Sequence, residues 1–182
     1  MNESEEPKSL TPRMLKWAQN SALYRVSRQM LSRRQLHDAV LRKAREKFED
    51  IGNDEARALA EAAVAFAETI GGLDDEAFAE VKTRSAVRNG KSRRMIAVSL
   101  ARKGIDKETA QAALTEQADD LAAVVALARR RAFGPFRRAD ADEARKDKEL
   151  AAILRQGFNF ELARRVSAMS REEADDILSG LP

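Results

Sequence analysis

The sequence has no cysteine, a single histidine and only 5% aromatic residues in its 182 residues. Without cysteine the chain supports no disulfide framework, no thiolate nucleophile and no cysteine-based zinc site. With His37 as its only histidine, it supports neither a histidine-based metal cluster nor a Ser-His-Asp triad. We expect His37 to lie at the surface beside Asp38.

Long apolar runs are also missing. No stretch approaches the roughly 18 apolar residues needed to cross a bilayer, and the acidic start, Met1 to Leu10, does not resemble a secretory signal. Gly71-Gly72 lacks the Gly-Lys-Ser/Thr of a Walker loop. The adjacent acids Asp74 and Asp75 are typical of a helix cap rather than an acid/base pair. We therefore predict a cytoplasmic protein with no membrane partner, catalytic residue, small-molecule substrate, cofactor or metal.

The composition favours helices. Hydrophobic residues make up 43% of the chain and charged residues 35%, so the few aromatics leave a core of Ala, Leu, Ile and Val, as in all-α proteins. Nowhere do five or more residues alternate in polarity with β-branched enrichment, so no strand is predicted. We expect Trp17 and Tyr24, seven residues apart on one helix face, to belong to the core rather than to a base-stacking platform.

An internal repeat organises the chain. The segment Ser32 to Lys43 recurs 60 residues later as Ser92 to Lys103, with apolar pairs Leu36/Ile96 and Val40/Leu100. The five identities are Ser32/Ser92, Arg33/Arg93, Arg34/Arg94, Arg42/Arg102 and Lys43/Lys103. A second match, at an offset of 53, aligns Leu100 to Ala113 with Ile153 to Val166. Short units of this kind bury their apolar faces by stacking. The fold predicted is all-α, with three tandem three-helix, helix-turn-helix-like repeats in an elongated, curved array.

Local signals place the predicted boundaries. Thr11-Pro12 starts a helix that runs to about Leu31, and Ser32 with Gln35 forms a capping box for the next. The third helix buries Leu59, Ala62, Ala63, Phe66 and Ile70. A helix near 140–156 begins with a capping box from Asp140 to Glu143, and Ser170 with Glu173 caps the last helix. Ala44 stands where the other repeats have Gly104 and Gly157, which predicts a longer second helix or a displaced loop. The predicted division is an acidic flexible tail 1–12, modules 13–72, 73–118 and 119–169, and a short C-terminal helix or tail 170–182.

Charge alternates along the chain. Residues 13–47 carry ten Lys/Arg against two acids, and residues 82–103 carry eight Lys/Arg with no acid. Between them, residues 54–80 carry eight acids against Arg57 alone. Arginine suits recognition of carboxylate or phosphate because its planar fork binds both bidentately. The candidate binding residues are Arg33, Arg34, Arg42, Lys43, Arg84, Arg88, Lys91, Arg93, Arg94, Arg102 and Lys103, with a further cluster of Arg129, Arg130, Arg131, Arg137 and Arg138 around the Gly134-Pro135 bend.

One segment resembles a known family. The order and spacing of its residues are similar to the central signature of the RecX family, the bacterial regulators of RecA recombinase. The residues that carry this resemblance are Leu73-Asp74-Asp75, Phe78-Ala79, Arg84, Arg88, Gly90-Lys91, Ile96, Leu100 and Lys103-Gly104-Ile105. It extends from about Leu15 to Met169. The resemblance implies three three-helix repeats and binding along the groove of a RecA filament on single-stranded or double-stranded DNA. It also implies modulation of ATP hydrolysis, strand exchange and repressor cleavage in DNA repair and the SOS response, without catalysis by the protein itself.

Other interpretations of the basic helices stay open. A stand-alone DNA-binding or architectural protein also uses three-helix units with a basic helix, a structural adaptor would act through the acidic helices, and a basic flank can simply be solvated. Among these we favour a monomeric regulator, an inhibitor, of RecA.

Overall fold

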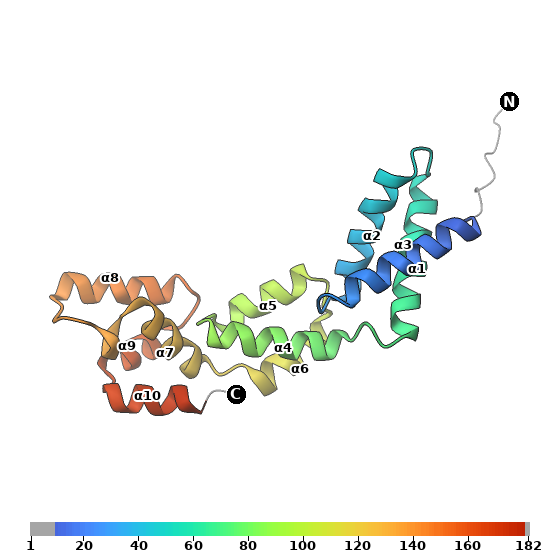
Figure 1. Ribbon diagram of the computed structural model, residues 1–182. Coiled ribbons are helices and arrows are strands. Elements are labelled where there is room, and N and C mark those ends of the chain that lie inside the picture. Colours follow the sequence, from blue (N-terminus) through green and yellow to red (C-terminus); the bar gives the residue numbers. More distant parts are fainter. Residues whose placement is uncertain (1–9, 181–182) are drawn as a thin grey trace. The chain divides into compact units, whose positions relative to one another are not determined.

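The computed structural model describes residues 10–180, and the helices can be followed in Figure 1. Within this range the chain forms ten α-helices, one short 3-10 helix and no strand, which confirms the all-α prediction. The elements are α1 (Pro12–Val26), α2 (Arg33–Lys47), α3 (Asn53–Thr69), α4 (Asp75–Arg88), α5 (Arg93–Arg102), α6 (Lys107–Gln117), α7 (Asp120–Arg131), η1 (Gly134–Phe136), α8 (Glu143–Leu154), α9 (Phe160–Ala168) and α10 (Arg171–Ser179). None of these helices combines the length and apolar character that a bilayer crossing requires. Most of the predicted acidic tail lies outside the described residues.

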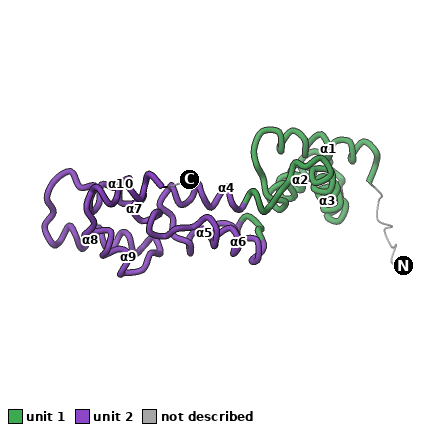
Figure 2. The backbone as a smooth tube through the Cα atoms, turned by 90° about the horizontal axis from the view of Figure 1, so that it is seen from below, with its two compact units in different colours: residues 1–78, 103–105 green, residues 79–102, 106–182 purple. Residues whose placement is uncertain are grey.

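The chain divides into two compact units, coloured separately in Figure 2. The first contains residues up to Phe78 together with 103–105, and the second contains residues 79–102 and those from Asp106 onward. The boundary therefore falls inside α4. The finer division into three modules stays a prediction.

The core of the first unit lies where α3 packs against α1 and α2. Leu36 and Val40 of α2 are fully buried, as their spacing predicted, and Leu59 of α3 meets the same core. The predicted face of α3 is only partly right. Leu59 and Ala63 are buried as predicted, but Ile70 is exposed and Ala62 and Phe66 are half-buried. Three further small residues that were not predicted are buried as well: Ala56, Ala60 and Ala67.

Trp17 and Tyr24 have different surroundings. Trp17 is half-buried, and its ring meets Phe48 edge to face with centroids 5.2 Å apart. Tyr24, in contrast, is 57% exposed, with the Arg28 guanidinium 4.6 Å from its ring centroid. The prediction that Tyr24 belongs to the core is wrong because the buried stripe of α1 is formed by Ala18, Ser21 and Ala22, and Tyr24 lies at the edge of that stripe.

Several helix ends agree with the predicted caps. The Thr11, Ser32 and Ser170 hydroxyls each accept a backbone N–H three residues on. Of the two outcomes predicted from Ala44, the longer second helix is the one found: α2 continues to Lys47 before the connection to α3. Two boundaries were wrong. Helix α1 ends at Val26 rather than near Leu31, which is a buried core residue between α1 and α2. Helix α8 begins after Asp142, whose carboxylate accepts the Arg145 N–H, rather than after Asp140.

The second unit is organised around α7. Seven successive residues of this helix, Ala122 to Ala128, are buried, because α9, α10 and η1 pack around it. Its small side chains let these neighbours approach on every side, as in a fully buried helix. The connection after α7 turns at Ala132 and Gly134, both in the left-handed region.

Candidate basic interface

The first residues of α2 make structural contacts. Ser32 and Gln35 form the predicted capping box. The buried Ser32 hydroxyl also donates a hydrogen bond to the Lys103 carbonyl oxygen (2.6 Å), and the Arg33 N–H donates to Asp75 Oδ1 (2.9 Å). Both contacts reach residues more than forty positions away in the sequence, so the start of α2 is fastened to the turn after α5 and to the start of α4.

The first residues of α5 make the same contacts with the segments that follow them. The buried Ser92 hydroxyl donates to the Gln156 carbonyl oxygen (2.7 Å), and the Arg93 N–H donates to Asp120 Oδ1 (2.8 Å). The Arg93 guanidinium also donates to the Ala118 carbonyl oxygen (3.2 Å). The repeated serine is therefore explained by this joint between helices. The first arginine contributes its backbone N–H in both helices, which any residue except proline could donate, and only in Arg93 does the guanidinium also take part.

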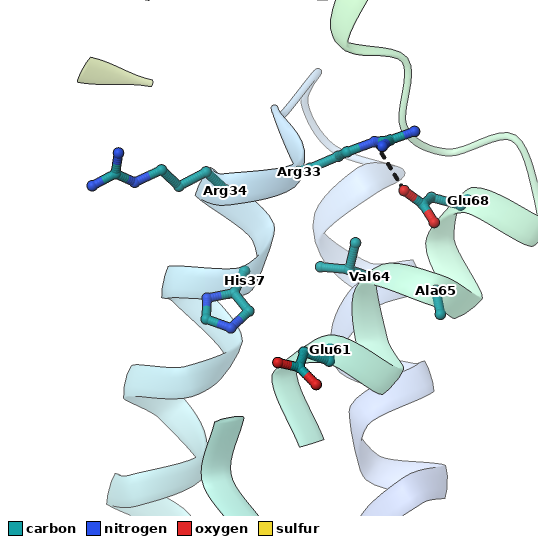
Figure 3. Close-up of a pocket in the computed structure, with 7 residues that line it drawn as sticks. All are labelled: Arg33, Arg34, His37, Glu61, Val64, Ala65 and Glu68. Atoms are coloured by element: carbon teal, nitrogen blue, oxygen red, sulfur yellow. Dashed lines mark ion pairs between the residues drawn. The ribbon is translucent and has the colours of Figure 1, made fainter. Parts of the chain in front are cut away.

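Arg33 also lines a groove between α2 and α3, where it pairs with Glu68 (Figure 3). Its lining residues are Arg33, Arg34, His37, Glu61, Val64, Ala65 and Glu68. Arg33 Nε lies 2.8 Å from Glu68 Oε1, and Arg34 points away from this pair. The His37 side chain is 30% exposed, with Nδ1 3.3 Å from Asp38 Oδ1. Two carboxylates, those of Glu61 and Glu68, line the groove beside the two arginines, so its charged lining is balanced.

The solvent face of α2 is partly neutralised by its own acids. Arg34 Nε lies 3.7 Å from Asp38 Oδ2, and Lys43 Nζ lies 2.6 Å from Glu46 Oε2. The hydrogen bond and charge of Lys43, with a smaller contribution from Arg42, lower the pKa of Glu46. Arg42 is exposed and makes no ion pair with any described residue.

The solvent face of α5 carries the corresponding cations without the acids. Arg94 and Arg102 are exposed, and neither forms an ion pair within the described part of the chain. Val98, 47% exposed, occupies the position equivalent to Asp38 and lies between the two arginines at i+4 and i+8 spacing. Met95, 41% exposed, adjoins them. This set, which we call the α5 face, is a cationic and apolar surface with no carboxylate of its own: Arg94, Met95, Val98 and Arg102.

The other cations of the second basic block have mixed surroundings. Arg84 is 30% exposed, and its Nη1 lies 3.4 Å from Glu80 Oε2. The Lys103 ammonium lies over the Phe78 ring, 5.9 Å from the centroid. The remaining two predicted residues are the exposed Arg88 and the half-buried Lys91.

The third predicted cluster is split by the structure. Arg129, Arg130 and Arg131 are exposed in the last turn of α7, where cations also complement the helix dipole. Arg138 is exposed, but Arg137 is only 17% exposed. Arg137 is therefore mostly buried, whereas the other four arginines of this cluster are exposed.

Arg137 belongs to a buried charge cluster centred on Glu149, which is 3% exposed. One carboxylate oxygen of Glu149 accepts from Arg137 Nε (2.8 Å) and from the Gly134 N–H (3.1 Å), and the other accepts from Arg145 Nε (3.3 Å). Burial alone would raise the pKa of Glu149, but the hydrogen bonds from Arg137, Gly134 and Arg145 outweigh it and lower the pKa. Arg137 therefore has a structural role, which the sequence did not reveal because Glu149 lies twelve residues further on.

Across residues 10–180, no group of three or more Asp, Glu or His side chains is arranged to hold a metal ion. What distinguishes the surface is its cations: exposed arginines on two equivalent helices, held by a repeated joint. The fold and these helices define a class of all-helical proteins built from short related units, with basic helices as their candidate interaction surface.

Sequence comparison identifies the family. A family model described as "RecX, second three-helix domain" matches residues 74–114. The chain is 56% identical over 172 residues to the regulatory protein RecX of Agrobacterium fabrum (strain C58 / ATCC 33970), covering 94% of this chain and 93% of that one. It is 33% identical over 168 residues to the regulatory protein RecX of Myxococcus xanthus (strain DK1622), covering 89% and 88%. This chain therefore belongs to the RecX family of regulatory proteins.

Solved structures share its fold. A crystal structure of RecX from Lactobacillus salivarius matches with a TM-score of 0.61 at 23% identity, covering 91% of this chain and 99% of that one. A second crystal structure, of regulatory protein RecX, matches with a TM-score of 0.62 at 21% identity, covering 86% and 72%.

Proposed function

We propose that this protein is a monomeric cytoplasmic inhibitor of RecA recombinase that binds the RecA–DNA filament, in its helical groove, through exposed cations. By occupying the groove it lowers DNA-dependent ATP hydrolysis, strand exchange and repressor cleavage, and so acts in homologous recombination, DNA repair and the SOS response. Membership of a family of regulatory proteins named RecX supports this proposal.

The observation that carries the proposal is the α5 face. Arg94 and Arg102 lie about 12 Å apart along the helix axis, because they are eight residues apart at about 1.5 Å per residue. Since no carboxylate of the helix competes for them, both guanidinium groups can bind a carboxylate or phosphate of a partner. Val98 between them, 47% exposed, supplies apolar area that becomes buried on contact.

The equivalent cations of α2 contribute less in this proposal. Arg34 must exchange its contact with Asp38 for one with the partner, and Lys43 must do the same with Glu46. The Arg33 guanidinium is paired with Glu68 and the Arg93 guanidinium donates to the Ala118 carbonyl oxygen, so in this proposal both side chains are engaged within the protein and contribute less to binding. Of the two neighbouring arginines at the start of each helix, the proposal therefore assigns binding to the second, Arg34 in α2 and Arg94 in α5.

A titration of RecA ATPase on single-stranded DNA tests the proposal. We expect the double variant Arg94→Glu/Arg102→Glu to need about tenfold more protein for half-inhibition, because losing two interfacial charge contacts costs on the order of 1.4 kcal/mol or more. The control is Arg57→Glu, which reverses an exposed arginine (63%) on the acidic helix α3. Both variants should keep the wild-type circular dichroism spectrum.

Unchanged inhibition by the folded double variant would contradict the proposed role of the α5 face. The DNA-binding alternative is tested by comparing bare duplex DNA with RecA-coated DNA at one salt concentration, since phosphate contacts alone make affinity strongly salt-dependent. Equal affinity for both would favour a stand-alone DNA-binding protein. Binding that survives in the α5 double variant but fails when acids of α3 are neutralised would favour an adaptor.

A further inference from the structure

The solvent face of α1 is a second basic surface, made by residues other than the candidate cations of α2 and α5. Helical spacing brings one set of exposed residues to a single side of α1 and the turn that follows it. These residues, which we call the α1 face, are Arg13, Lys16, Asn20, Leu23, Tyr24, Ser27 and Arg28.

This face has no acidic residue. Between Leu10 and His37 the chain carries six cations and no Asp or Glu. Arg25 is held by its own helix, donating to the Ser21 carbonyl oxygen (3.1 Å) and hydroxyl (2.6 Å). Arg13, Lys16 and Arg28 form no ion pair with any residue in the range 10–180. The α1 face therefore presents uncompensated positive charge, which attracts a polyanion.

An aromatic ring lies among these cations. Tyr24 is 57% exposed and the neighbouring Leu23 is 50% exposed. The Arg28 guanidinium lies 4.6 Å from the Tyr24 centroid, a cation–π contact that favours one placement of the ring. Lys16 lies about two helical turns before Tyr24, and Arg28 lies four residues after it in the turn beyond α1, so cations flank the ring on both sides in the sequence.

We propose that the α1 face binds single-stranded nucleic acid, with a base stacked on Tyr24 and with Lys16 and Arg28 contacting phosphates on either side. A cationic surface interrupted by an exposed aromatic ring is the combination that single strands recognise, because the phosphates bind the cations and an unpaired base offers its flat face to the ring. A duplex satisfies only the cations, since its bases are already stacked. An acidic protein likewise needs no exposed ring beside the cations.

This inference does not depend on the proposed function. It concerns α1 rather than α5, and its test uses a bare oligonucleotide without RecA. Failure of one proposal leaves the other standing.

Tyr24 is the only tyrosine of the chain, which allows a direct test. With 3-fluorotyrosine incorporated, the protein gives a single fluorine NMR signal from this position. We expect the signal to shift when oligo(dT) is added, since a stacked base changes the magnetic environment of the ring. An unchanged signal at saturating oligonucleotide would overturn the proposal.

Affinity measurements distinguish the contribution of the Tyr24 ring to binding from that of the charged side chains. We expect Tyr24→Ala to weaken oligo(dT) binding about tenfold, within the range measured for loss of one stacked base, while Tyr24→Phe retains the affinity because it keeps the ring. Lys16→Ala should weaken binding and reduce the salt dependence by about 0.7 in slope, as for one lost phosphate contact on a single strand. Since both side chains are exposed, all three variants should melt at the wild-type temperature.

An abasic oligonucleotide of the same length is the matched ligand. Wild-type protein should bind it more weakly than oligo(dT), whereas Tyr24→Ala should bind the two equally. Equal wild-type affinity for both ligands, or full oligo(dT) affinity in Tyr24→Ala, would contradict stacking. If Tyr24→Ala instead lowers binding to RecA-coated DNA while oligo(dT) affinity is unchanged, the α1 face binds protein and the proposal is wrong.

Discussion

Replacing Glu149 with glutamine removes one negative charge from the interior and keeps the size of the side chain. In the wild type, this carboxylate is 3% exposed and holds Arg137, 17% exposed, together with the Gly134 N–H. An amide retains one acceptor oxygen but leaves the buried guanidinium without a counter-charge. The contact with Arg137 accounts for most of the loss, because a hydrogen bond to a charged group contributes about 1.5–3 kcal/mol. The pair with Arg145, itself 54% exposed, adds only about 0.3–0.5 kcal/mol.

We therefore expect the Glu149→Gln variant to lose about 2 kcal/mol of unfolding free energy at pH 7, measured by urea denaturation followed by circular dichroism. The pH dependence has a definite sign. Because folding lowers the pKa of Glu149 below its ordinary value of 4.5, its stabilising contribution is complete above that value and is lost as the pH falls through the folded-state pKa. The difference between wild type and variant should therefore shrink below about pH 4.5.

Two companion variants separate the contacts. Arg137→Ala should lose nearly as much unfolding free energy as Glu149→Gln, whereas Arg145→Ala should lose less than about 0.5 kcal/mol because its side chain is mostly in solvent. Wild-type stability of Glu149→Gln at pH 7 would refute the reasoning. So would a difference from wild type that stays constant down to pH 3.

Two further substitutions test the joints at α2 and α5. Gly104→Ala should lose about 1–3 kcal/mol of unfolding free energy, because the φ of Gly104 is +81° and a Cβ there would lie 2.4 Å from the Cβ of Arg34. The control Gly71→Ala, at a residue with a similar φ but with open space around it, should lose only about 1 kcal/mol. Equal melting temperatures for the two variants would contradict a close approach at Gly104. Ser92→Ala removes both a helix cap and a buried donor and should lose about 2 kcal/mol, against about 1 kcal/mol for the exposed cap variant Ser170→Ala, as compared by urea denaturation.

Features set by neighbouring residues could be predicted from the sequence. The caps at Thr11, Ser32 and Ser170 depend on a hydroxyl and a backbone N–H three residues apart, so a short window of sequence contains both partners. The buried stripe of Leu36 and Val40 follows from helical spacing for the same reason.

Features set by distant residues could not be predicted. The sequence of α1 does not show which of its side chains the other helices cover, so Tyr24 was assigned to the core although it is exposed. Arg33 and Arg137 lie in basic stretches of the sequence and so looked like binding residues. Their guanidinium groups are in fact paired with Glu68 and Glu149, which only folding brings close to them. Among charged residues, the sequence could propose which cations matter but could not distinguish those already paired from those available to a partner.

The joint at the start of α2 and α5 has a consequence for the start of α8. It requires a helix-capping side chain that can also donate a hydrogen bond to a carbonyl of the next segment, which the hydroxyls of Ser32 and Ser92 do. The cap of α8 is Asp142, whose carboxylate only accepts hydrogen bonds. The carboxylate of Asp142 therefore cannot make the hydroxyl-to-carbonyl hydrogen bond by which Ser32 and Ser92 are fastened to a later segment. Any segment that packs against the start of α8 must be held there by other contacts.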